Sequence, residues 1–280
     1  MTGKTVLLTG ATSGIGLEAA VRIARLGADL VIVARNSGKG DRALADIRTR
    51  SGSDRVSLLL CDFSSLESVR ALAQSFLTAH QRLDVLVNNA GTVNPERVVT
   101  KDGFELTFAV NHLAPFLLTS LLRDAIVRSA PSRIVTVASE AHRSGQIDFA
   151  DLQFQNGGYS GLKAYNRSKL ANILFTGELA RKLAGTGVTA NCLHPGVVST
   201  NIWSHASWYL QPLVMLIKPF MVSAATGGET IVYLAAGPDV AGQTGGYYVK
   251  NKRVDPAPHA MDRTAAARLW DESAKLTGQG

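Results

Sequence analysis

Short apolar runs alternate with longer stretches of helical periodicity along the whole chain of 280 residues. Runs rich in valine, leucine and isoleucine, the composition of buried strands, occur at 5–10, 29–36, 55–63, 83–91 and 132–139. Between them, apolar residues recur at the three- and four-residue spacing of amphipathic helices. This alternation predicts a doubly wound α/β fold, in which a mostly parallel sheet of about seven strands carries helices on both faces.

A single domain is expected for residues 1–280. No Pro/Ser-rich linker or internal repeat interrupts the pattern, and hydrophobic residues make up 46% of the chain, enough for a sizeable core. Cys61 and Cys192 lie in apolar runs without metal-ligand spacing, which favours a reducing compartment and predicts no metal site. A strand-like run starts at Thr5, so we expect no signal peptide or anchor before it, and a cytoplasmic protein.

The charge pattern and the longest apolar stretch narrow the choice of partners. The net charge is +7, but lysines and arginines are spread along the chain, which favours a solvated basic surface over nucleic-acid binding. The apolar stretch at 209–224 is broken by Pro212, Lys218 and Pro219, and is too short to span a bilayer. Residues 201–222 are interpreted as an apolar substrate lid, with a packed helix pair, a subunit contact or a membrane-surface contact as alternatives.

A glycine-rich turn, TGATSGIG, joins the first strand to the first helix. Gly10, Gly14 and Gly16 would let the backbone approach a pyrophosphate at the positive end of the helix, although such a turn can also merely connect two elements. The next strand ends at Arg35, where a sheet that binds NAD normally offers an acid to the ribose. Arg35 presents a planar fork to a 2′-phosphate, which predicts NADP(H); the alternative is an exposed arginine that opens a loop.

Three further strand ends deliver polar residues to the same edge of the sheet. Asp62 follows the third apolar run, where its side chain would meet an adenine amino group. Asn-Asn-Ala-Gly at 88–91 ends the fourth run, in the crevice where such sheets bind ligands, or simply makes a turn. Ser139 ends the fifth, and its hydroxyl would donate a hydrogen bond to a substrate carbonyl.

The segment 104–122 is predicted to be a long buried helix with a polar break. The break contains Asn111 and His112 and is followed by Pro115, which removes a backbone hydrogen bond and bends a helix. Asn111 either supports this bend or holds a water molecule in the site through its side chain or a freed carbonyl group.

Two Tyr-x-x-x-Lys pairs lie within thirteen residues, and their surroundings distinguish them. Tyr159 is flanked by glycines that disfavour a helix, so we expect it at the rim of the site, without alignment to Lys163. A helix is predicted from Leu162 onward, in which Tyr165 and Lys169 lie one turn apart. An ammonium roughly 5 Å from the phenol is expected to lower the pKa of Tyr165 from about 10 to about 8, suitable for acid–base catalysis.

Taken together, these motifs resemble the short-chain dehydrogenase/reductases: TGATSGIG, NNAG, Asn111, Ser139, YNRSK at 165–169 and HPGVVST at 194–200, in this order over most of the chain. The resemblance implies a Rossmann-type fold and a catalytic tetrad of Asn111, Ser139, Tyr165 and Lys169. Tyr165 would donate a proton to the carbonyl oxygen, while Asn111 positions a water molecule. The implied cofactor-binding residues are Gly10, Thr12, Ser13, Gly14, Ile15, Gly16, Arg35, Asp62, Phe63, Asn89, Ala90, Gly91, Tyr165, Lys169, Pro195, Gly196, Val198 and Thr200.

A subgroup is indicated as well, since VNHLAPFLLT, the segment after Ser139 and ARLWDESAKLTG are similar to retinol-dehydrogenase-like members. That subgroup has a long insertion, which accounts for the 26-residue step from 139 to 165. The resemblance implies an NADP(H)-dependent oxidoreductase that acts on a lipophilic ketone, aldehyde or matching alcohol. Alternatives are a non-catalytic NADP-binding regulator and an epimerase or dehydratase with bound cofactor. The resemblance also implies a homo-oligomer, a dimer or tetramer, with contacts through helices around 104–122 and 162–184.

Overall fold

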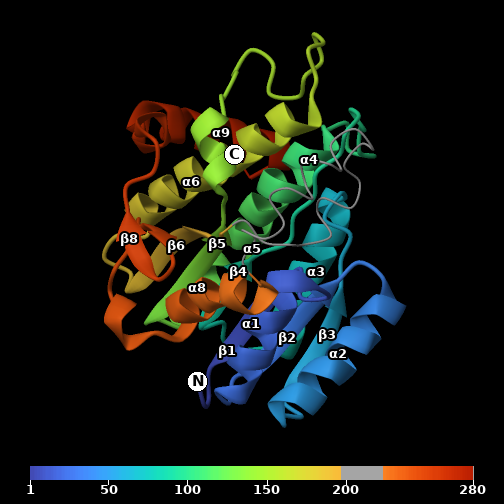
Figure 1. Ribbon diagram of the computed structural model, residues 1–280, viewed down its shortest axis with the longest axis vertical. Coiled ribbons are helices and arrows are strands. Elements are labelled where there is room, and N and C mark those ends of the chain that lie inside the picture. Colours follow the sequence, from blue (N-terminus) through green and yellow to red (C-terminus); the bar gives the residue numbers. More distant parts are fainter. Residues whose placement is uncertain (197–222, 280) are drawn as a thin grey trace.

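One sheet organises the computed structural model, which describes residues 1–196 and 223–279 (Figure 1). Its eight strands follow the order β3-β2-β1-β4-β5-β6-β7-β8. All neighbouring pairs are parallel except β7 and β8. The strands are β1 (Thr5–Thr9), β2 (Asp29–Ala34), β3 (Val56–Leu60), β4 (Val85–Asn88), β5 (Ser132–Val137), β6 (Val188–His194), β7 (Tyr247–Val249) and β8 (Lys252–Val254).

The predicted fold class is confirmed, and the strand beyond the expected seven is the short antiparallel β8. Its three residues are exposed, so no apolar pattern marks it in the sequence. Lys250 and Asn251, between β7 and β8, both have positive φ angles of 50° and 63°. A two-residue turn with this backbone geometry reverses the chain into a hairpin.

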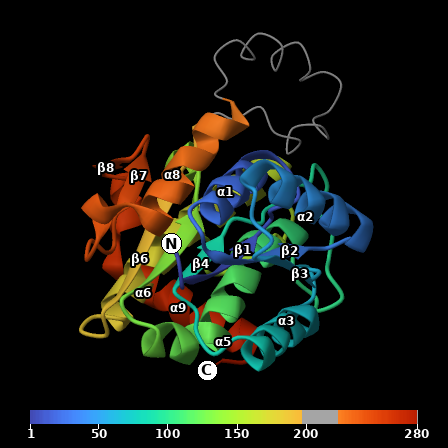
Figure 2. The same cartoon turned by 90° about the horizontal axis from the view of Figure 1, so that it is seen from below.

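Helices cover both faces of the sheet, as Figure 2 shows. On one face lie α1 (Gly14–Arg25), α2 (Ser37–Ser51) and α8 (Ala224–Ala236). The other face carries α3 (Leu66–Ala79), α5 (Ala114–Arg128) and α6 (Gly161–Lys182), and α9 (Arg263–Thr277) packs on α6. Along β1 the side chains alternate between the two cores, because Leu8 packs toward α1 while Leu7 packs toward α5. Burial on both faces explains why the strands are almost entirely apolar.

The order of strands reverses at β1, which pairs with β2 on one side and with β4 on the other. The sheet is therefore extended from β1 toward β2 and β3 on one side, and toward β4, β5 and β6 on the other. The connections that follow β1 and β4 run to opposite faces of the sheet and separate at the carboxyl end of β1. In open α/β sheets this separation creates the crevice that binds ligands.

The long helix predicted at 104–122 is present as consecutive helical segments, and its polar break is a π-helical turn. The segment α4 (Leu106–Phe108) leads into a π-helical segment, Ala109–Leu113, and α5 begins at Ala114. Pro115 lies in the first turn of α5, directly after the π-helical segment. The break at Asn111 is thus a π-bulge, a feature that often marks functional positions.

The C-terminal helix α9 covers part of the face expected to join two copies of the chain. Trp270 of α9 lies with its ring 4.9 Å from Phe116 of α5 and 5.8 Å from Phe175 of α6, centre to centre. Beside it, Ser273 and the buried His112 are hydrogen bonded at 2.8 Å. The homo-oligomer stays a prediction.

Candidate active site

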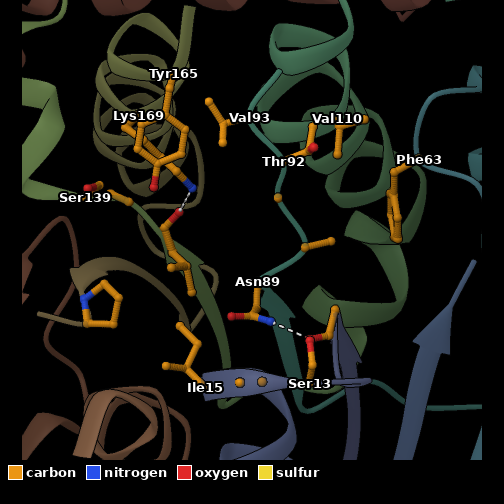
Figure 3. A pocket seen from close by; sticks show the side chains of 18 of the residues that line it. Ser13, Ile15, Phe63, Asn89, Thr92, Val93, Val110, Ser139, Tyr165 and Lys169 are labelled. Atoms are coloured by element: carbon orange, nitrogen blue, oxygen red, sulfur yellow. Dashed lines mark hydrogen bonds between the residues drawn. The ribbon is translucent and has the colours of Figure 1, made fainter. Parts of the chain in front are cut away.

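A cavity of roughly 680 Å³ lies at the carboxyl ends of β1, β2, β4, β5 and β6. In Figure 3, Tyr165, Lys169 and Ser139 gather on one side of this cavity, and Phe63 lies at the opposite side. The predicted cofactor residues within the described ranges all line it: Gly10, Thr12, Ser13, Gly14, Ile15, Gly16, Arg35, Asp62, Phe63, Asn89, Ala90, Gly91, Tyr165, Lys169, Pro195 and Gly196. Val198, Thr200 and the expected lid at 201–222 lie outside the described residues.

The glycine turn has a backbone that requires glycine at three positions. Gly10 and Gly14 adopt left-handed φ angles of 69° and 57°, which favour glycine. At Gly16 a Cβ atom would stand 2.2 Å from the carbonyl oxygen of Gly10, so no side chain fits there. The helix α1 begins at Gly14, and its positive end therefore faces the cavity.

The Asn-Asn-Ala-Gly segment holds this turn in place. The side-chain nitrogen of Asn89 donates to the carbonyl oxygens of Thr9 and Gly10, both at 2.9 Å. In return, the hydroxyl of Thr9 accepts hydrogen bonds from the backbone amides of Asn89 and Ala90. The segment is therefore a structural brace for the glycine turn as well as part of the cavity wall.

The opposite end of the cavity contains Asp62 and Arg35. Asp62 accepts hydrogen bonds from the backbone and hydroxyl of Ser64, at 2.9 and 2.7 Å, which fixes its carboxylate. Arg35 is exposed and makes no hydrogen bond or ion pair with another residue of the described ranges. The adjacent Asn36 starts α2 by accepting from the amide of Lys39. Within the described ranges, this end of the cavity therefore carries an arginine side chain without a protein partner.

The predicted catalytic pair lies on α6, whose start at Gly161 confirms the helix expected from Leu162. Lys169 lies one turn after Tyr165, with its ammonium nitrogen 5.5 Å from the centre of the phenol ring. The same nitrogen donates to the carbonyl oxygen of Val137 at 3.1 Å (Figure 3). Ser139 follows β5, and its hydroxyl accepts from the amide of Ala141.

The expected pKa shift of Tyr165 is wrong in this structure. Burial raises the pKa of Tyr165, although a hydrogen bond with Ser139 acts in the opposite direction. Burial also lowers the pKa of Lys169 to about 8. The sequence argument omitted the cost of desolvating both groups, which depends on the surrounding protein. The value near 8 therefore belongs to the lysine, and the phenol keeps its proton at neutral pH.

Asn111 lies beneath the cavity and does not line it. Its side-chain nitrogen donates to the carbonyl oxygen of Thr92 and to the hydroxyl of Ser168, both at 2.9 Å. Its side-chain oxygen accepts from the backbone amide of Thr92 at 2.7 Å. The fully buried side chain thus ties the loop at Thr92 to the π-helical segment and α6, which supports the structural alternative.

Two histidines beside the site were not singled out from the sequence. His142 donates from Nδ1 to the carbonyl oxygen of Ser139 at 2.7 Å, and its Nε2 accepts from the amide of Ala257 at 3.0 Å. This arrangement requires the neutral ring and links Ser139 to the C-terminal region. His194 ends β6 and lines the cavity, and burial lowers its pKa. Only its place before Pro195-Gly196 gives a signal in the sequence.

The substrate side of the cavity was also missed, because its residues come from separate segments. It is lined mainly by apolar side chains: Val93, Leu106, Val110, Ala141 and Leu162. Tyr159, expected at the rim, does not line the cavity, because its hydroxyl group is bonded to Asn94 and Glu105. Within the described ranges, no helix is long and apolar enough to cross a bilayer, and no cluster of three metal-binding side chains occurs.

Comparisons with known proteins agree with this geometry. Residues 4–208 match the family model described as short chain dehydrogenase. Retinol dehydrogenase 14 of Mus musculus is 44% identical over 291 residues, covering 99% of this chain and 87% of the relative. Retinol dehydrogenase 13 of Homo sapiens is 42% identical over 284 residues, with 99% and 85% covered.

Solved structures show the same fold. An uncharacterized protein from Mycobacterium paratuberculosis has a TM-score of 0.79 at 32% identity, covering 99% of this chain and 94% of that one. Actinorhodin polyketide ketoreductase with NADPH has a TM-score of 0.68 at 27% identity, with 88% and 96% covered. The chain belongs to the short-chain dehydrogenase family and is a retinol-dehydrogenase-like member of it.

Proposed function

We propose that this protein is an NADP(H)-dependent oxidoreductase that interconverts a lipophilic ketone or aldehyde and the matching alcohol. One observation carries the proposal: a single cavity joins the glycine turn and Arg35 at one end to Ser139, Tyr165 and Lys169 at the other. The cofactor, when bound, supplies the hydride for reduction and accepts it in oxidation.

Tyr165 is the proposed general acid. Since burial raises its pKa, the phenol is protonated at neutral pH and is ready to donate to a carbonyl oxygen. The Ser139 hydroxyl stands beside it and would donate a second hydrogen bond to the same oxygen as negative charge develops. The side-chain nitrogen of Lys169 donates one hydrogen bond to the carbonyl oxygen of Val137, and its remaining N–H groups can donate to a ribose hydroxyl.

Arg35 supports the preference for NADP(H) over NAD(H). It follows β2, lines the cavity and has no carboxylate partner among the described residues, so it is free to bind a 2′-phosphate. The structural neighbour with NADPH is consistent with this choice. Asp62 would face the adenine, and the Pro195-Gly196 backbone would lie beside the nicotinamide.

A lipophilic substrate is favoured by the lining of the other side. Val93, Leu106, Val110 and Leu162 present apolar side chains, and the relatives are named for retinol, a lipophilic alcohol. The two free, buried cysteines suit the reducing cytoplasm, where we place the protein, with a peripheral membrane contact as the alternative.

The test is cofactor oxidation against a panel of lipophilic ketones and aldehydes, retinal among them, with NADPH and NADH in parallel. We expect turnover with NADPH, and a loss of about 100- to 10,000-fold in Tyr165→Phe with cofactor affinity retained. Tight NADPH binding without turnover of any carbonyl would indicate a regulator. Conversion of substrate without net use of NADPH would indicate an epimerase or dehydratase.

A further inference from the structure

The substrate side of the cavity includes a loop, residues 92–95, that we call the substrate wall. Thr92, Val93 and Asn94 line the cavity there. Asn111 holds the first residue of the wall through the two hydrogen bonds between its side chain and the backbone of Thr92. The other end of the wall needs a separate anchor, because a loop fixed at one point can swing into or out of the cavity.

Tyr159 provides that anchor. Its hydroxyl donates to the carbonyl oxygen of Asn94 at 2.9 Å, with Oε1 of Glu105 as a second acceptor at 3.2 Å. The fully buried Glu105 also accepts from the amides of Thr107 and Phe108, so its carboxylate starts α4. Burial, reinforced by the charge of Glu105, raises the pKa of Tyr159 to about 12, which keeps the donor proton in place.

The ring of Tyr159 is itself held from α6. It meets Phe154 edge to face, with centres 5.4 Å apart, and the guanidinium of Arg167 lies 3.8 Å from the centre of the Phe154 ring. Arg167 also donates to the carbonyl oxygens of Gln146, Asp151 and Leu152. The insertion before the catalytic tyrosine is therefore fastened to α6 two residues beyond Tyr165.

The start of α6 packs closely against the substrate wall. A Cβ atom at Gly161 would stand 2.3 Å from the carbonyl oxygen of Asn94, the same oxygen that accepts from Tyr159. Helix, insertion and wall thus converge on one carbonyl group. The side chain of Lys163 is exposed and makes no hydrogen bond or ion pair with another described residue, so it takes no part in this arrangement.

We propose that Tyr159 is a positioning residue that fixes the substrate wall and thereby selects bulky lipophilic carbonyl compounds over small ones. The substrate class in this proposal rests on the proposed function. Bulky substrates would contact Val93 and its neighbours and need the wall in place, whereas a small aldehyde needs only Ser139 and Tyr165.

The test compares Tyr159→Phe with Lys163→Ala, a matched change at the other member of the pair. For Tyr159→Phe we expect kcat/KM for a bulky ketone to fall about five- to tenfold relative to a small aldehyde. NADPH affinity and kcat for the small aldehyde should stay within about twofold of the parent, and Lys163→Ala should change nothing. An equal loss for both substrates, or unchanged selectivity, overturns the proposal.

Hydrogen exchange at the amides of residues 92–94, 96 and 97 gives a readout that does not depend on activity. Faster exchange in Tyr159→Phe supports anchoring even if the parent reduces none of the panel, in which case the proposed function fails alone. Unchanged exchange overturns the anchoring itself. Should Tyr159→Phe fold poorly, Glu105→Gln removes the charged acceptor, keeps one oxygen for the start of α4, and is expected to act in the same direction.

Discussion

The two Tyr-x-x-x-Lys pairs have the same spacing, only six residues apart, but opposite relations to the cavity. Tyr165 and Lys169 lie within α6 and both line the cavity, whereas Tyr159 precedes the helix and Lys163 points into solvent. Burial raises the pKa of both tyrosines, so acidity does not separate them. Access to the cavity separates the two tyrosines. The hydroxyl of Tyr165 faces the cavity, whereas the hydroxyl of Tyr159 is hydrogen bonded to the substrate wall.

The largest expected effect on activity comes from replacing the lysine of each pair. Lys169→Met should lower turnover by about 100-fold or more and weaken NADPH binding, because it removes a buried cation beside the phenol. Steady-state kinetics and fluorescence titration with NADPH measure the two effects. The same change at Lys163 should leave both within about twofold, and a comparable loss there would contradict the assignment of the pairs.

The same variant should differ from the parent in stability. Burial lowers the pKa of Lys169 from 10.5 to about 8, so the unfolded chain binds more protons between these values and the folded parent gains stability as pH rises. The free energy of unfolding of the parent should therefore rise, relative to Lys169→Met, by on the order of 3 kcal/mol from pH 8 to 10.5. Denaturant titrations of both proteins across this range measure it, and parallel curves would refute the shift.

A smaller effect sharpens the role of the region around Tyr159. Gly161→Ala should lower the free energy of unfolding by about 1–3 kcal/mol, because the new methyl group meets the backbone of Asn94. Gly177 lies on the same helix with open space around it, so Gly177→Ala should raise stability by up to about 1 kcal/mol. Thermal and denaturant unfolding compare the two variants. Equal effects on the free energy of unfolding would mean that the substrate wall moves to accommodate the new methyl group at no cost.

Local patterns predicted the part of the molecule that would hold the cofactor. The apolar runs of β1 to β5 and the helical periodicity of α1 and α6 depend on neighbours along the chain, and so do the glycines of the turn. Parallel strands then bring residues such as Asp62, Asn89 and Ser139 to one edge by geometry alone. The catalytic set rested in addition on resemblance to a family, since each motif alone is ordinary.

Other features were invisible because they depend on contacts between distant segments. Nothing local shows that Asn111 lies in a π-bulge and binds Thr92, or that His142 joins Ser139 to Ala257. The strand β8 is polar and short, and its pattern resembles a loop.

The sequence by itself thus determined the strands β1 to β5, their alternation with helices, and which tyrosine pairs with a lysine on one helix face. The tertiary structure alone decided what each tyrosine does. Desolvation and hydrogen bonding are sums over all surrounding atoms, and for Tyr165 and Tyr159 those atoms belong to segments up to 65 residues away. Spacing sets which side chains can meet, whereas the packed surroundings set their charge, their access and their chemistry.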